Sequence, residues 1–82
     1  MAEILYFGRL SDVTGTFCEQ VSLPASVSDT SAVRSWLDQE NALDGALLEA
    51  SVRLAVNGEI VTDPYPVTDG DEIAFLPPVG GG

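Results

Sequence analysis

The 82-residue chain contains no histidine, no lysine and a single cysteine, Cys18. These absences remove the residue clusters that most metal sites and most Cys/His or Ser/His catalytic pairs require. One cysteine also excludes a disulfide within the chain. Isolated carboxylates remain, but no spacing pairs two of them for acid–base catalysis. The sequence therefore predicts no bound metal or cofactor, and no catalysis by the chain alone.

Long hydrophobic runs are missing as well. No apolar segment approaches the length that crosses a bilayer, and residues 1–3 lack the basic region of a signal peptide. The length suffices for one domain with a single modest core. These features predict a small cytoplasmic domain that does not enter a membrane.

Positive charge is scarce. Thirteen acidic residues stand against three arginines, which gives a formal net charge of −10. A field of this sign repels nucleic acid and anionic membranes, and it favours a partner with a basic surface. It also keeps a small domain soluble. We expect both consequences, and no binding to nucleic acid.

The end of the chain is rich in proline and glycine. Pro77 and Pro78 are followed by Val79 and by the glycines Gly80, Gly81 and Gly82. Prolines end a strand, and glycines lose the most conformational freedom on ordering. We therefore divide the chain into a folded domain, residues 1–77, and a flexible tail, residues 78–82. Extended, that tail reaches roughly 16 Å and carries the Gly82 carboxylate at its tip.

A frayed end without function is the plain alternative for these glycines. They follow an apolar strand and a proline pair directly, however, with no serine or affinity-tag residues around them. This context favours a functional tail that enters a narrow slot on a partner.

Apolar runs and turn signals predict five strands and one principal helix. The strands are expected within residues 3–10, 16–23, 52–56, 59–61 and 72–76. Asn57-Gly58 predicts a type I′ hairpin, because both of its central positions need positive φ. The helix is expected to start near Ser28, Asp29 or Thr30 and to end at Asn41. Residues 42–51 are expected to hold a second, short helical segment.

The first and last strands are the most apolar, so we expect them to be adjacent, parallel and central in a mixed sheet. The principal helix then crosses one face, which is an α+β architecture. The expected core consists of the inward residues of both strands and the apolar stripe of the helix: Ile4, Tyr6, Val33, Trp36, Leu37, Ile73 and Phe75. Four polar helix residues are expected to face solvent: Arg34, Ser35, Asp38 and Glu40.

One helix covers only one face of a sheet. Large apolar residues are therefore left on the other, open face, and such clusters usually mark a contact surface. The alternative is that the second helical segment covers them. Cys18 is expected to be a small, buried and inert strand residue. The residues expected on the open face are Leu5, Phe7, Ile60, Ala74 and Leu76; those expected to bind a partner are Leu5, Phe7, Ile60, Leu76, Pro77, Pro78 and Val79.

With its Gly-Gly ending, this predicted body resembles the ubiquitin-like sulfur carriers of β-grasp fold. The run from Asp69 to Gly82 is most similar to the small subunit of molybdopterin synthase (MoaD, in the MoaD/ThiS-type family). Ile4-Leu5-Tyr6-Phe7-Gly8 and Ala55-Val56-Asn57-Gly58 also match, so the resemblance covers nearly the whole chain. Its specific part is the Pro-Pro-Val-X-Gly-Gly ending, in which Gly80 takes the variable place.

The resemblance implies a mechanism. An E1-like activating enzyme would use ATP to join the Gly82 carboxylate to AMP, and a persulfide sulfur would then leave a thiocarboxylate there. The tail would next enter the large subunit of molybdopterin synthase. Its sulfur would pass to cyclic pyranopterin monophosphate and help to build the molybdopterin dithiolene. The chain would thus serve as a sulfur donor in molybdenum cofactor biosynthesis.

Three other interpretations stay open. A sulfur carrier for thiamine biosynthesis would use the same tail chemistry. A ubiquitin-like protein modifier would be activated in the same way and would then acylate a lysine on a target protein. A plain interaction module would use only the apolar face.

Overall fold

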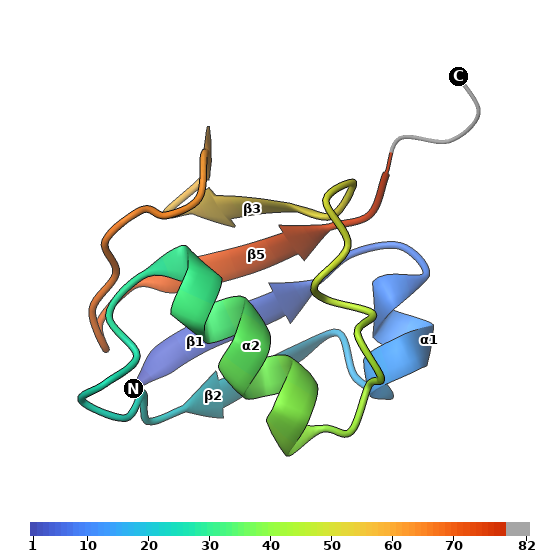
Figure 1. Cartoon of the computed structure of the whole chain (residues 1–82), viewed down its shortest axis with the longest axis horizontal. Coiled ribbons are helices and arrows are strands. Elements are labelled where there is room, and N and C mark those ends of the chain that lie inside the picture. The colour runs from blue at the N-terminus through green and yellow to red at the C-terminus, as the bar shows by residue number, and fades with distance from the viewer. Residues whose placement is uncertain (79–82) are drawn as a thin grey trace.

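Five strands form one mixed sheet, and the principal helix crosses one of its faces (Figure 1). The structure is a computed structural model that describes residues 1–78. In chain order the elements are β1 (Ala2–Tyr6), α1 (Leu10–Thr14), β2 (Cys18–Val21), α2 (Thr30–Glu40), β3 (Arg53–Val56), β4 (Glu59–Val61) and β5 (Glu72–Leu76).

The strand order is β2-β1-β5-β3-β4. β1 and β5 run parallel side by side, with Ile4 opposite Ile73 and Tyr6 opposite Phe75. β2 joins β1 antiparallel, and β3 joins both β5 and β4 antiparallel. The predicted pairing of the first and last strands at the centre of a mixed sheet is confirmed. The arrangement is that of a β-grasp fold.

The core lies between the sheet and α2. Alternate residues of β1 and β5 point toward the helix, as the two-residue period of a strand requires. Ile4, Ile73, Phe75 and Val33 are fully buried there, and the Tyr6 and Phe75 rings stack with centroids 5.6 Å apart. Trp36 is only partly buried, and it packs against this core from its edge. Apart from Trp36, the predicted core is confirmed.

Helix α2 (Thr30–Glu40) begins directly after Asp29, one of the three residues predicted as its N-cap. Asp29 is extended, and its Oδ1 accepts the Ala32 N–H at 2.8 Å, which satisfies one of the helix's first unpaired donors. Asn41 ends the helix, as predicted. Within residues 1–78, neither helix is long and apolar enough to span a membrane.

Residues 42–51 differ from the prediction. They form a series of turns rather than a second helix, with Ala42, Asp44 and Gly45 all at positive φ. Leu47 is nevertheless fully buried in the core on the α2 side of the sheet. The segment therefore helps α2 to cover that face, and it leaves the open face uncovered.

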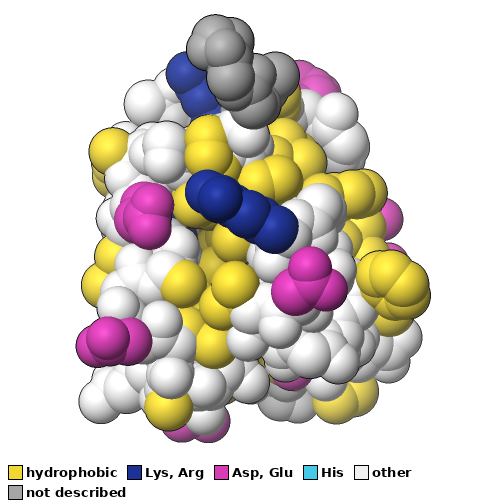
Figure 2. All heavy atoms as spheres, turned by 90° about the vertical axis from the view of Figure 1, so that its right-hand side faces the viewer, with side chains coloured by type: hydrophobic (Ala, Val, Ile, Leu, Met, Phe, Trp, Pro, Cys, Tyr) yellow, Lys and Arg dark blue, Asp and Glu magenta, His cyan; other side chains and the backbone are white. Residues whose placement is uncertain are grey.

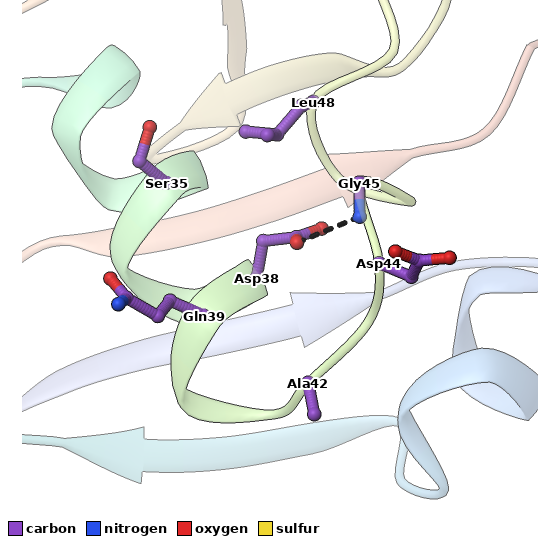
Figure 3. A pocket seen from close by; sticks show the side chains of 7 residues that line it. All are labelled: Ser35, Asp38, Gln39, Ala42, Asp44, Gly45 and Leu48. Carbon is purple, nitrogen blue, oxygen red and sulfur yellow. Dashed lines mark hydrogen bonds between the residues drawn. The ribbon is translucent and has the colours of Figure 1, made fainter.

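Two polar helix residues hold this segment in place, so the prediction that they face solvent is wrong. Asp38 is buried, and its carboxylate accepts the Leu47 N–H at 2.9 Å. It also accepts the Gly45 N–H at 2.9 Å, the bond drawn in Figure 3. The Arg34 guanidinium donates to the carbonyl oxygens of Leu47 and Glu49. These side chains satisfy backbone groups that a helix would have paired internally.

Asn57 and Gly58 connect β3 and β4 with φ values of 51° and 87°. Both φ values are positive, as the predicted type I′ turn requires. The Asn57 side chain also donates to Asp71 at 2.9 Å, which joins this hairpin to the turn before β5. The short β4 lies at the edge of the sheet. Pro64 and Pro66 follow it, and prolines, which cannot donate to a ladder, are tolerated beside an edge strand.

Candidate functional site: the open face and the start of the tail

The strand register arranges the open face in rows that run across the sheet. A polar row consists of Gln20, Glu3 and Glu72. The next row is apolar and contains Cys18, Leu5, Ala74, Ala55 and Ile60. The last row lies where β5 ends and contains Phe7, Leu76 and Arg53. The open face therefore changes from acidic to apolar and then to aromatic and cationic toward the start of the tail.

The predicted contact residues differ in exposure. Ile60 and Phe7 are 61% and 47% exposed, whereas Leu5, Leu76, Pro77 and Pro78 are partly buried. Ala74 lies on the open face but is only 6% exposed, because its side chain is short and sits in a central strand. The structure brings Leu5, Phe7, Ile60 and Leu76 onto one face. Val79, Gly80, Gly81 and Gly82 lie outside the described residues.

The chain leaves the sheet at Pro77, which is seated against Gly8. The Phe7 N–H donates to the Phe75 carbonyl at 3.1 Å, and this is the last bond between β1 and the end of β5. Gly8 follows with φ of +56°, and a Cβ at this position would lie 2.9 Å from Pro77 Cγ. Glycine is thus required here both for its backbone conformation and for the close approach of the proline. This contact fixes the position of Pro77 at the end of β5.

An apolar hollow of about 670 Å³ opens beside this point. It is lined by Leu5, Phe7, Gly8, Phe17 and Cys18, together with Tyr6 and Ser11. Figure 2 views the end of the molecule where α1 lies, and hydrophobic side chains gather on it. The hollow extends the exposed apolar surface from the open face toward the β1–β2 edge.

Phe17 and Cys18 are the surface residues that the sequence interpretation missed. Phe17 is 74% exposed, and Cys18 is exposed rather than buried. Cys18 lies opposite Leu5 in the antiparallel pair, so its side chain belongs to the open face. The alternation of side chains along the two strands could have indicated this, because residues opposite each other in a strand pair point to the same face of the sheet.

Two acidic residues lie far from the start of the tail. Asp69 and Asp71 lie in the turn that precedes β5, at the opposite end of that strand from Pro77. The pKa of Asp69 is lowered first by the Leu23 N–H, which donates to it, and that of Asp71 first by the Asn57 side-chain amide. Both carboxylates therefore stay charged to a lower pH than an ordinary aspartate does. Among residues 1–78 no group of His, Cys, Asp and Glu side chains is arranged to hold a metal ion.

Comparison with known proteins identifies the family. The ThiS family model matches residues 4–82. The chain belongs to the ThiS family. Within it, the molybdopterin synthase sulfur carrier subunit of Escherichia coli is 35% identical, and the match covers the whole of both chains. The human protein of that name is 34% identical over 98% of this chain and 92% of its own length.

Solved structures agree with this assignment. SAMP1 from Haloferax volcanii superposes with a TM-score of 0.80 over 99% of this chain and 98% of its own; at 22% identity it shows the fold alone. One chain of the complex of subunits 1 and 2 of the molybdopterin-converting factor from Helicobacter pylori superposes with a TM-score of 0.67 at 26% identity. The match covers 99% of this chain and 97% of that chain. The resemblance predicted from the sequence is therefore confirmed at the level of family and fold.

Proposed function

We propose that this protein is the sulfur carrier subunit of a molybdopterin synthase. The observation that carries the proposal is the match, over the whole chain, to relatives that bear the name molybdopterin synthase sulfur carrier subunit. The exposed apolar face beside Pro77 supports it, because a carrier must dock before its tail can deliver anything. The site residues are Gly82 as the sulfur-bearing group and Gly80 and Gly81 as the slender segment before it.

The chemistry requires activation, because a carboxylate is a poor electrophile. An E1-like enzyme transfers AMP from ATP to the Gly82 carboxylate and releases pyrophosphate. The terminal sulfur of a persulfide then attacks the acyl carbon, and AMP departs. Cleavage of the S–S bond by a thiol leaves the thiocarboxylate on Gly82. The domain contributes no acid or base to these steps and acts as the handle that both enzymes recognise.

The acceptor partner is the large subunit of the synthase. The complex of subunits 1 and 2 of the molybdopterin-converting factor from Helicobacter pylori supports such a pairing. The open-face residues Leu5, Phe7, Ile60 and Leu76, continued by Pro77, Pro78 and Val79, form the docking surface in this proposal. The tail, residues 78–82, enters the large subunit and passes its sulfur to cyclic pyranopterin monophosphate. All these steps take place in the cytoplasm.

Mass spectrometry of the protein purified from its own cells tests the function. We expect a fraction of the intact chain to be heavier by the difference between one sulfur and one oxygen atom, located at Gly82. Deletion of Gly81-Gly82 should abolish both this species and sulfur transfer. Thermal melting should stay almost unchanged, because the expected tail buries nothing.

Other outcomes assign other functions. Isopeptide-linked conjugates without the sulfur-bearing species would identify a protein modifier. A sulfur-bearing chain that supports thiamine synthesis but not molybdopterin synthesis would identify a carrier for that pathway. Absence of both kinds of product would leave an interaction module, and the proposal would be wrong.

A further inference from the structure

The three arginines of the chain have different surroundings. The Arg34 Nε lies 2.7 Å from the Asp63 carboxylate, and its side chain is only 12% exposed. Arg9 and Arg53 are both exposed. Within residues 1–78, neither of these two has an acidic side chain at ion-pair distance. The positive charge that the chain leaves available to a partner is therefore concentrated in two residues.

These two residues lie on either side of the strand that leads to the tail. Arg9 directly follows Gly8, the residue against which Pro77 is seated. Arg53 lies on β3, opposite Leu76, the last residue of β5. β1 and β3 are the two neighbours of β5 in the sheet. Figure 2 shows basic side chains among hydrophobic ones at this end of the molecule, with acidic side chains beside them.

Two acidic residues of the sheet and two of the turn before β5 lie at the other end of the sheet. Glu3 and Glu72 pair across β1 and β5 at the start of both strands, and Asp69 and Asp71 lie just before β5. The protein as a whole has a net charge of −10. A partner with a uniformly basic surface would therefore attract most of this protein but repel the point where the tail begins.

We propose that Arg9 and Arg53 form a cationic collar around the start of the tail, and that this collar contacts carboxylates on the rim of the large subunit's tail-binding pocket. The inference rests on the proposed function. The reacting end of the tail lies up to roughly 16 Å beyond Pro77 when extended, so the collar stays at the entrance of the pocket while Gly82 reaches its floor. Groups at the floor, such as the substrate phosphate, are therefore out of reach of the collar.

The collar orients the carrier. Exposed ion pairs add little affinity one at a time, but charge complementarity fixes the register of two docking surfaces and penalises wrong orientations. Together with the acidic row at Glu3 and Glu72, the collar makes the open face electrically polar. A carrier that docks in the reversed orientation would place its arginines against the basic part of the partner and its carboxylates against the acidic rim.

Binding of collar variants to the native large subunit tests the proposal. Arg53→Gln and Arg9→Gln each remove one positive charge from an exposed side chain, so the fold should be preserved, which thermal melting verifies. Ser31→Asp lies in the first turn of α2 and is exposed; it changes the net charge by the same single unit far from the tail. Arg53→Lys retains the charge at the collar.

We expect each Arg→Gln variant to raise the Kd by about 2- to 5-fold at low salt, and the double variant by about 5- to 20-fold. Ser31→Asp and Arg53→Lys should bind like the parent. The direction of the change in Kd separates the two possibilities, because a generally basic partner would bind the more acidic Arg→Gln variants more tightly. Equal or tighter binding of the double variant would overturn the collar. Failure of the parent itself to bind the large subunit or to carry sulfur would instead overturn the proposed function.

Discussion

The two faces of the sheet are built from alternate residues of the same strands, yet their surroundings differ completely. On one face, Ile4 and Phe75 are fully buried beneath α2 and the turns of residues 42–51. On the other, Phe7 and Ile60 are about half exposed or more. The apolar residue types are similar, so hydrophobicity alone does not distinguish core from contact surface. The distinction comes from what covers each face: the one long helix within residues 1–78 and the turns of residues 42–51 lie on the same side of the sheet.

The largest effect is expected when the same truncation is made on each face. Phe75→Ala removes a fully buried ring that stacks on Tyr6. It should lower the free energy of unfolding by about 3–5 kcal/mol, which is a large part of the stability of a domain this size. Phe7→Ala, on the open face, should cost less than about 1 kcal/mol. Urea denaturation of both variants measures the difference, and equal losses would mean that the open face is packed.

The next effect concerns the loop that completes the buried face. Asp38→Ala leaves the N–H groups of Gly45 and Leu47 without their acceptor, the first in a partly buried place and the second in a buried one. The expected loss is about 1–3 kcal/mol. Hydrogen exchange of these two amides should become much faster. Exchange of the β1 and β5 amides should become faster only as far as the loss of global stability requires. Glu40→Ala is the matched control, because Glu40 is exposed on the same helix. A wild-type exchange rate at Leu47 in Asp38→Ala would contradict the role of this carboxylate.

A charge placed on the open face should separate binding from folding. Phe7→Arg inserts a guanidinium into the apolar part of the docking surface while the exposed site lets it stay hydrated. Affinity for the large subunit should fall by about 10-fold or more, and the melting temperature should change by only a few degrees. Calorimetric titration and thermal melting measure the two quantities. Unfolding of Phe7→Arg would mean that this face is part of the core.

The sequence alone was sufficient where local chemistry and periodicity act together. The Asn57-Gly58 hairpin follows from two positive φ values, and the assignment of Leu5 and Phe7 to the face opposite Ile4 and Tyr6 follows from the period of a strand. The start and end of α2 were predictable because its caps are local. The parallel pairing of β1 and β5 followed from their apolar composition.

Long-range polar contacts were not predictable in this way. The spacing of Leu43, Leu47 and Leu48 is typical of a helix, but the segment folds as turns because Asp38 and Arg34 supply partners for its backbone. In the sequence these two residues look like a solvated helix face. Likewise, nothing local to Gly8 reveals that Pro77 lies against it. Such contacts join residues whose distance along the chain carries no periodic signal.

The smallest expected effect is at the acidic end of the open face, where Asp71 links two turns. Its carboxylate accepts from the Asn57 side chain at 2.9 Å and from the Thr68 N–H at 2.8 Å, and these bonds lower its pKa in the folded protein. A lowered pKa stabilises the fold above the unfolded value of about 3.9, and this contribution is lost as the pH falls through the folded pKa. Asp71→Asn should therefore melt a few degrees below the parent at pH 7, and the gap should close as the pH is lowered below about 4. Glu49→Gln, which changes an exposed carboxylate on the covered side, should melt like the parent at every pH. A gap for Asp71→Asn that stays constant from pH 7 to pH 3 would show that the charge of Asp71 does not stabilise this end of the face.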